Sequence, residues 1–285
     1  MNGIIIINKP KNCTSHDIVY KIKKIVNEKV GHTGTLDPNA TGVLPLLIGK
    51  GTEISKYLIE HDKTYEAVIQ LGEKRDTADV EGQVIQKKEV QASTLENEKV
   101  KEVLKSFIGK KLQTPPIYSA IKVKGKKLYE YARKGENVEI EPRKINIYNI
   151  ELIKIDQINK TIEFRVHCSK GTYIRTLCED ISEKLGNIGY MKQLKRTQVG
   201  EFKIENSVQI EEIKSKEEAE KYLITLEKYF SNKEDIKLKE ITPFLNGVQI
   251  SYNLPDDIYK IYDKDGKFIG IGTIKNKLLK RDIII

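Results

Sequence analysis

The chain of 285 residues is long enough for one large domain, or for a large domain with a small one, and 39% of its residues are hydrophobic. This composition excludes an intrinsically disordered protein, and no apolar run approaches the length that spans a membrane. The net charge of +9 favours a polyanionic partner, and a basic face that serves only solubility is the alternative.

The first fifty residues are predicted to form a strand, a helix, a loop and a second strand. Residues 4–7 are four isoleucines, which is typical of a short buried strand. Thr14 and Asp17 have the spacing of a capping box, and apolar residues then recur at helical spacing as far as Val26. Residues 43–48 can form the second buried strand.

The rest of the chain mixes strands and helices without a regular βαβ repeat. We expect strands over 64–72, 82–90, 145–155 and 161–168, helices over 95–108 and 172–185, and a polar helical stretch over 210–239. From residue 241 on, short strands alternate with Gly and Asp turns. The pattern predicts an α+β fold with a mixed, mostly antiparallel sheet flanked by helices, and a small C-terminal β-rich domain.

The cysteines and histidines form no disulfide or metal-binding pattern. Cys13, Cys168 and Cys178 are odd in number and far apart, and the four histidines are equally scattered. Such spacing favours a reducing compartment and predicts no zinc site. The N-terminus lacks the segments of a secretory signal in series, so we expect a cytoplasmic protein.

The segment GHTGTLDPNATG, residues 31–42, contains Asp37, the only Asp, Glu, Lys or Arg between Val30 and Gly49. Pro38 biases Asp37 away from a helical backbone, and the glycines allow a ligand or another chain to approach closely. A carboxylate placed in this way could be a nucleophile, a general base or a metal ligand, although no second acid lies nearby in sequence. The alternative is an Asx turn in which Asp37 only bonds a backbone N–H.

The segment CSKGTYIRTL, residues 168–177, offers a cation that could keep a buried carboxylate ionised. Arg175 lies at the start of a predicted helix, whose N-terminal N–H groups also suit a phosphate. Tyr65 and Tyr173 could stack on a nucleobase that has left its helix. The alternatives are a solvated arginine at an ordinary helix start and two tyrosines that belong to the core.

Positive charge is concentrated in residues 99–144, where thirteen Lys and Arg and five Glu give a net charge of +8. Within this segment, residues 115–135 interleave tyrosines with basic side chains, among them Lys124, Lys126 and Lys127. This combination suits an RNA backbone with exposed bases.

Two nearby stretches have less specific interpretations. Residues 128–134 could be an ordinary solvated amphipathic helix. The acidic residues of RDTADVEG, residues 75–82, do not have the spacing of a calcium-binding loop, and we interpret them as a turn.

Seven stretches, in order along the chain, resemble the bacterial tRNA pseudouridine synthases that isomerise uridine 55 in the T arm, the TruB family. They are NKPKNCTSHD, GHTGTLDPNATGVLP, KTYEAVIQLG, DTADVEG, PPIYSAIKVKGKKLYEYARKG, CSKGTYIRTL and LKRTQVG. The C-terminal tail resembles, more loosely, the small RNA-binding PUA-type domain of these enzymes. One position departs from the family pattern: Asn12 stands where the first motif usually has glycine, and asparagine tolerates a positive φ better than most residues.

The resemblance implies roles for individual residues. Asp37 matches the catalytic aspartate, Tyr65 the tyrosine that stacks on the flipped base and has been proposed as a proton acceptor, and Arg175 the arginine that pairs with the aspartate. The matched substrate-binding positions are Lys9 and Pro10 at the border of the active site, His32, which fills the space that the uridine vacates, and Tyr173 and Leu194 in the pocket.

The resemblance also implies the domains, the reaction and the partners. The expected architecture is a pseudouridine-synthase domain over residues 1–233, with a basic RNA-binding insertion around 115–144, and a PUA-like RNA-binding domain over 234–285. The expected reaction converts uridine 55 in the T-arm stem-loop of tRNA to pseudouridine. The resemblance implies that this reaction needs no metal or cofactor. It also implies a monomeric enzyme that needs no protein partner and does not bind a membrane.

Three questions about the reaction stay open at this point. Asp37 could attack C1′ of the ribose, attack C6 of the uracil, or assist through a glycal intermediate. The enzyme could act on a different RNA uridine. The chain could also be a non-catalytic module that binds RNA or helps tRNA to fold.

Overall fold

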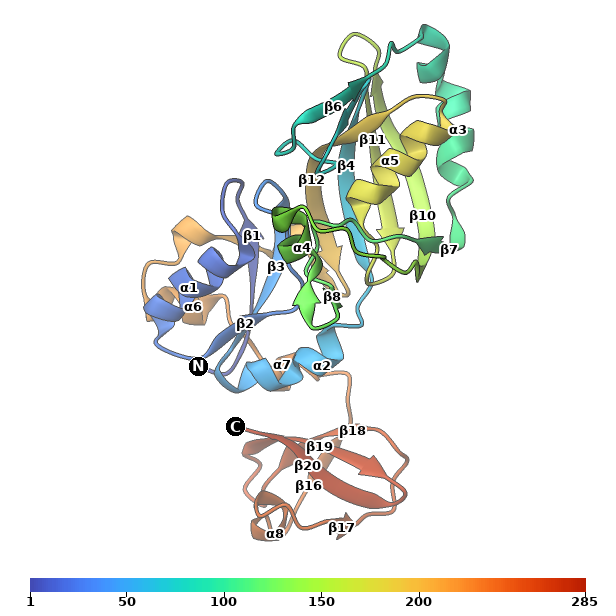
Figure 1. The fold of residues 1–285 in the computed structure, drawn as a ribbon. Helices are drawn as coiled ribbons and strands as arrows, with labels where there is room; N and C mark the ends of the chain where they lie inside the picture. Colours follow the sequence, from blue (N-terminus) through green and yellow to red (C-terminus); the bar gives the residue numbers. More distant parts are fainter. The chain divides into compact units, whose positions relative to one another are not determined.

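A computed structural model describes all 285 residues (Figure 1). They divide into two compact units. Unit 1 comprises residues 1–38, 44–59 and 205–285, and unit 2 comprises residues 39–43 and 60–204. None of the helices has both the length and the apolar character needed to cross a membrane.

The N-terminal part of unit 1 is built on a small sheet with α1 (Ser15–Val26) packed against it. Its strands are β1 (Gly3–Lys9), β2 (Val30–His32), β3 (Thr41–Ile48), β14 (Val208–Gln209) and β15 (Ile224–Thr225). In strand order β1 lies between β14 and β3, with β15 beside β1 and β2 beside β3. β1 and β14 run parallel, and the pairs of β1 with β15 and of β2 with β3 are antiparallel. Only residues 44–48 of β3 belong to this unit.

Helix α1 begins as its sequence predicts. The Asp17 carboxylate accepts a 2.7 Å hydrogen bond from the Thr14 N–H, and the Thr14 hydroxyl oxygen accepts one of 3.1 Å from the Asp17 N–H. The capping box is therefore confirmed. The helix ends at Asn27, which adopts the left-handed conformation with φ of 52°.

The polar stretch predicted to be helical over residues 210–239 is helical only in part, because it also contains strands at Ile224–Thr225 and Asp235–Lys237. Its α-helices are α6 (Lys216–Lys221) and α7 (Leu226–Tyr229), each started by a new side-chain cap, Ser215 and Thr225. The segment offers one buried residue to each helix, Ala219 and Leu226, so no continuous apolar stripe extends either helix.

The C-terminal tail forms a five-stranded sheet in the order β16-β18-β19-β20-β17, which confirms the expected β-rich tail. The strands are β16 (Asp235–Lys237), β17 (Ile250–Ser251), β18 (Ile258–Tyr262), β19 (Phe268–Lys275) and β20 (Leu278–Ile284), and α8 (Thr242–Leu245) precedes β17. The sheet has its own core around Phe244, Ile261 and Leu279. A domain boundary at residue 233 stays a prediction.

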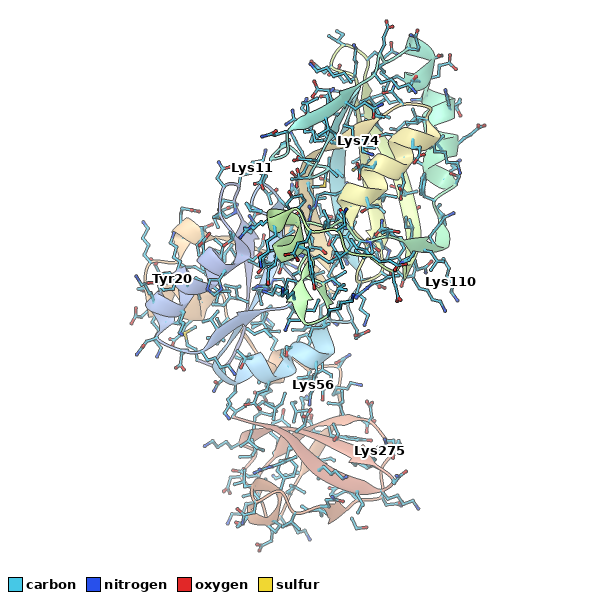
Figure 2. The ribbon with its side chains drawn as sticks, in the orientation of Figure 1. Lys11, Tyr20, Lys56, Lys74, Lys110 and Lys275 are labelled. Atoms are coloured by element: carbon cyan, nitrogen blue, oxygen red, sulfur yellow. The ribbon has the colours of Figure 1, made fainter.

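The tail sheet is joined by side chains to the helix α2 (Ser55–Leu58) of the same unit. Lys56, labelled in Figure 2, pairs with the Asp282 carboxylate, which also accepts a hydrogen bond from the Tyr57 hydroxyl. Burial and this hydrogen bond raise the pKa of Tyr57 well above its usual value.

Unit 2 contains an antiparallel sheet in the order β12-β4-β11-β10-β7, and residues 41–43 of β3 run parallel beside β12. The strands are β4 (Lys63–Leu71), β7 (Gly109–Gln113), β10 (Arg143–Asp156), β11 (Thr161–Cys168) and β12 (Gly189–Val199). Helices α3 (Asn97–Lys105) and α5 (Ile174–Lys184) pack on one face of this sheet (Figure 1).

The remaining elements are short. They are β5 (Glu73–Arg75), β6 (Val84–Lys87), β8 (Lys122–Val123), β9 (Lys126–Lys127), β13 (Phe202–Lys203) and α4 (Leu128–Lys134), with 3₁₀ turns at Gly49–Ile54, Ala92–Leu95, Ile204–Asn206 and Ile210–Glu212. The predicted α+β class with a mixed, mostly antiparallel sheet is confirmed. The predicted helix over 95–108 is shorter than expected, because it ends at Lys105 and Gly109, with φ of 103°, opens β7.

Candidate functional site

Two buried residues of unit 1 hold the backbone on either side of Asp37. The Ser15 hydroxyl accepts a 2.9 Å hydrogen bond from the Leu36 N–H and donates one of 3.2 Å to the Leu36 carbonyl. On the other side, the Lys9 ammonium donates to the Pro38 carbonyl at 3.0 Å. Asp37 itself is half-buried, so its carboxylate is fixed by anchored neighbours and is still open to a ligand.

Lys9 is fully buried at the end of β1. Its ammonium also donates to the carbonyls of Pro10 at 2.9 Å and Cys13 at 2.7 Å. A buried ammonium is tolerated only where acceptors replace water, so the three carbonyls explain its position. Lys9 thereby ties the loop after β1, Pro10 included, to the loop that carries Asp37.

Asn12 and His32 lie in the loops next to Asp37, and both have a defined local geometry. Asn12 has φ of 62°, so this asparagine adopts the left-handed backbone that its tolerance of positive φ allows, as expected for this loop. His32 ends β2, and its Nδ1 accepts a 3.3 Å hydrogen bond from the Gly34 N–H.

In unit 2, Tyr65, Leu194 and Arg196 gather on neighbouring strands. Arg196 pairs directly with Tyr65, and Leu194 pairs with Ala67. Residues two apart on a strand share a face, so all three side chains lie on the buried face of β4 and β12. Arg196 was not singled out from the sequence. The sequence does carry one clue to Arg196. It lies two residues from Leu194 on a strand, so a basic residue falls on the same buried face as Leu194.

Arg175 is buried in the first turn of α5 and is not the solvated arginine of the alternative interpretation. Its guanidinium lies 3.7 Å from the Asp79 carboxylate, and donates to the carbonyls of Tyr118 at 2.9 Å and Thr77 at 3.4 Å. The start of α5 is held by Gln113, whose side chain accepts from the Tyr173 N–H at 2.8 Å and donates to the Tyr173 carbonyl at 3.0 Å.

Asp79 is a functional candidate that the sequence analysis missed. The turn interpretation holds for Asp76, whose carboxylate accepts a 2.8 Å hydrogen bond from the Gln83 N–H. Asp79 instead is buried, accepts from the Thr77 hydroxyl at 2.7 Å and the Glu81 N–H at 3.0 Å, and faces Arg175. Nothing in the local pattern distinguishes the two acids, because the partner of Asp79 is far away in sequence.

The predicted basic cluster forms a hairpin followed by a helix in unit 2. Strands β8 and β9 are joined through Lys124 and Gly125, both at positive φ, which is the geometry of a type I′ turn. Lys126 lies 5.8 Å from the centre of the Tyr131 ring, and Lys127 lies 5.3 Å from that of Tyr129. Lys124 and Lys126 are exposed and Lys127 is half-buried, so the hairpin presents cations beside aromatic rings.

No cluster of three or more His, Cys, Asp or Glu side chains is arranged to hold a metal ion. The three cysteines are free thiols. Burial raises the pKa of Cys168 to about 12 and raises that of Cys178 well above its usual value, so neither thiol is activated as a nucleophile.

Comparison with known proteins gives one consistent family. Residues 22–174 match the TruB family pseudouridylate synthase (N terminal domain), and residues 175–231 match the tRNA pseudouridylate synthase B C-terminal domain. The chain is 48% identical to tRNA pseudouridine synthase B of Clostridium tetani over 281 residues, which are 95% of each chain. It is 46% identical to tRNA pseudouridine synthase B of Caldanaerobacter subterraneus subsp. tengcongensis over 285 residues, or 98% of each chain.

A solved structure gives a similar result for the fold. A chain from the crystal structure of a Cbf5-Nop10-Gar1 complex superposes with a TM-score of 0.69 and 25% sequence identity. The superposition covers 99% of the present chain and 85% of the other one.

Proposed function

Because the chain belongs to the TruB family of pseudouridylate synthases, we propose that it isomerises uridine 55 in the T arm of tRNA to pseudouridine. An enzyme of this family is an isomerase. The observation that carries the choice of tRNA is the similarity of nearly the whole chain to proteins named tRNA pseudouridine synthase B.

The reaction exchanges one bond of the nucleotide for another without net oxidation or reduction. The bond between N1 of uracil and C1′ breaks, the base rotates, and a bond between C5 and C1′ forms. One proton leaves C5 and one is gained at N1. The uridine must first leave its loop, at a cost of about a few kcal/mol of unstacking.

In this proposal Asp37 is the nucleophile that acts on the flipped uridine. Its support is the pair of anchors at Leu36 and Pro38, which hold the carboxylate in one place before the substrate binds. Asp37 also lies only five residues from Gly42, which pairs with Arg196 in the strand next to Tyr65. Chain connectivity alone therefore keeps the Cα atoms of Asp37 and Gly42 within about 18 Å.

Tyr65, Leu194 and Tyr173 are proposed to hold the base, and Arg175 to supply positive charge. A tyrosine ring next to an apolar leucine offers the flat surface on which a flipped base can stack. Arg175 is already paired with Asp79 in its own unit, so its guanidinium is oriented before tRNA arrives. We propose that Lys9 and Pro10 border the active site, and that His32 fills the space that the flipped uridine vacates.

The binding energy for flipping is proposed to come from contacts with the tRNA backbone. The exposed lysines of the β8–β9 hairpin, Lys124 and Lys126, and the half-buried Lys127 would neutralise phosphates. We extend the proposal to the tail, residues 234–285, as a PUA-like RNA-binding domain. The enzyme is proposed to work in the cytoplasm as a monomer without metal or cofactor.

The experiment that tests this function maps the product on a tRNA transcript. After incubation with the purified full-length chain, mass spectrometry of nuclease fragments or carbodiimide-primed reverse transcription locates pseudouridine. We expect it at position 55, and none in a matched transcript that carries cytidine there. Product at another uridine would replace the assigned target, and no product on any tRNA would favour the binding module.

A further inference from the structure

Arg196 is a charged side chain on β12 with an exposed fraction of only 1%. Its Nε donates a 2.8 Å hydrogen bond to the Val43 carbonyl, and its guanidinium also donates to the Tyr65 hydroxyl. Burial lowers the pKa of Arg196, and the contact with Tyr65 opposes that effect. Carrying a buried cation is costly, so a role in the reaction is a better explanation for Arg196 than packing alone.

Three strands fix the position of this guanidinium. Arg196 on β12 pairs with Gly42 of β3 on one side and with Tyr65 of β4 on the other. Gly42 has φ of 105°, and a Cβ at this position would lie 2.1 Å from the Arg196 carbonyl oxygen, so only glycine allows β3 to approach. The register of β12 against β4 shifts directly after Arg196, and such bulges redirect side chains beside active sites.

We propose that Arg196 is a positioning residue that fixes the Tyr65 hydroxyl and stabilises its phenolate form, so that Tyr65 can accept the proton that leaves C5 of the rotated uracil. The inference rests on the proposed function, in which Tyr65 contacts the flipped base.

The chemistry explains why a cation is needed at this place. Once C5 has bonded to C1′, C5 still carries its hydrogen and the ring has a double bond between N1 and C6. Loss of the proton turns the C5–H electron pair into the C5=C6 double bond. The electron pair of the N1=C6 double bond moves to N1, and N1 gains a proton from solvent. A neutral phenol is a poor acceptor for the C5 proton, whereas a phenolate beside a guanidinium accepts it and becomes the phenol.

Other titratable groups on the elements around Tyr65 could also change the pKa of its phenol. Lys63 lies two residues earlier on β4 and shares its face, and burial and Arg196 lower its pKa. The Lys63 ammonium donates to the His61 carbonyl at 2.6 Å. Cys168 of β11 is paired with Lys63.

The remaining groups lie on α5 and in the loop that faces it. Cys178 is a buried thiol on α5, and Arg175 on the same helix is paired with Asp79. Arg196 hydrogen-bonds the Tyr65 hydroxyl, so its removal should act directly on the phenol.

A direct test titrates the Tyr65 phenol in the full-length protein. The chain has 14 tyrosines and no tryptophan, so the phenolate absorbance of the protein minus that of a Tyr65→Phe variant isolates one group. We expect the Tyr65 midpoint to rise by about 1–2 pH units in Arg196→Gln, measured against its own Tyr65→Phe partner. Lys195→Gln, an exposed change at the neighbouring position of β12, should leave the midpoint unchanged.

An unchanged midpoint in Arg196→Gln would overturn the inference. If Arg196→Gln does not unfold cooperatively, Arg196→Lys serves in its place, because it keeps the charge but loses the planar geometry and should give a smaller rise. The titration does not depend on activity. A shift without any isomerisation by the wild type would therefore sink the proposed function and leave the role of Arg196 standing.

The second readout is the pH profile of the reaction under single-turnover conditions. Tritium release from tRNA labelled at C5 should be about 10- to 100-fold slower in Arg196→Gln near neutral pH, with the deficit closing as the pH rises. The tRNA affinity should stay near that of the wild type. An equal deficit at every pH would mean that Arg196 only supports the fold, and would contradict the inference.

Discussion

At the scale of single residues, the loop around Asp37 is held in place by two polar side chains that are buried from solvent. Lys9 and Ser15 are both buried, and each bonds the backbone next to Asp37. The segment between Val30 and Gly49 can therefore carry a single charged residue, Asp37, and still hold it rigidly, because the order of the loop comes from side chains on β1 and α1. Rigidity of this kind lowers the cost of reaching a reactive geometry.

The Lys9 anchor can be tested by stability. Lys9→Met removes the donor for three carbonyls and should lower the free energy of unfolding by about 1–3 kcal/mol, because three partly buried acceptors lose their partner. Urea unfolding measures this change. Lys11→Met is the control, because Lys11 is exposed (Figure 2) and its loss should change stability by less than about 0.5 kcal/mol. Equal losses in both variants would contradict the anchor.

Asp79 gives a second residue-scale prediction. Asp79→Asn leaves Arg175 buried without its carboxylate and should cost about 3 kcal/mol of stability and slow the single-turnover reaction. Asp76→Asn is the matched control, since Asp76 is an exposed acid of the same turn. Urea unfolding and tritium release measure the two effects. If both variants behaved as the wild type does, Asp79 would have no part in orienting Arg175.

At the scale of elements, local signals predicted local structure. The capping box of α1 was found because both partners lie within four residues, and β4, β10 and β11 were found because their apolar residues follow strand spacing. The prediction of helix over the whole of residues 210–239 was wrong. Lys and Glu favour helix, but the segment has too few apolar residues to pack a long helix against a core. The pairing of Arg175 with Asp79 could not be predicted, because it joins segments 96 positions apart in the chain.

The β8–β9 hairpin carries the element-scale prediction. Changing Lys124, Lys126 and Lys127 together to Gln should weaken tRNA binding and reduce the slope of log affinity against log salt by about 0.7–0.9 for each lost phosphate contact. Filter binding or fluorescence anisotropy over a salt series measures both. The same change at Lys21, Lys23 and Lys24 of α1 removes equal charge from another exposed surface. Matching losses in the two triple variants would show that only net charge matters.

At the scale of the whole molecule, buried acids make the fold sensitive to high pH. Burial raises the pKa of Cys168 to about 12 from 9.0, so the native state holds this proton more tightly than the unfolded chain. The contribution to stability is complete below the unfolded pKa of 9.0 and is lost as the pH rises towards 12. Cys178 and Tyr57 have raised pKa values as well and act in the same direction.

The expected loss for Cys168 is about 1.4 kcal/mol for each pH unit above the unfolded pKa. Urea unfolding at about pH 8 and about pH 10 measures it, and Cys168→Ala should show a shallower decline by this amount. Val166→Ala is the control, because it removes a buried side chain of the same strand without removing a proton. Identical declines for Cys168→Ala and the wild type would contradict the assignment.

The whole molecule is a pseudouridine synthase, and we propose that Asp37 is its nucleophile. Tritium release from tRNA labelled at C5 of uridine, compared between the wild type and Asp37→Asn, tests this most directly. We expect release by the wild type alone, while Asp37→Asn still binds tRNA, because the amide keeps the shape of the loop and loses only the nucleophile. Equal release by both proteins would contradict the claim.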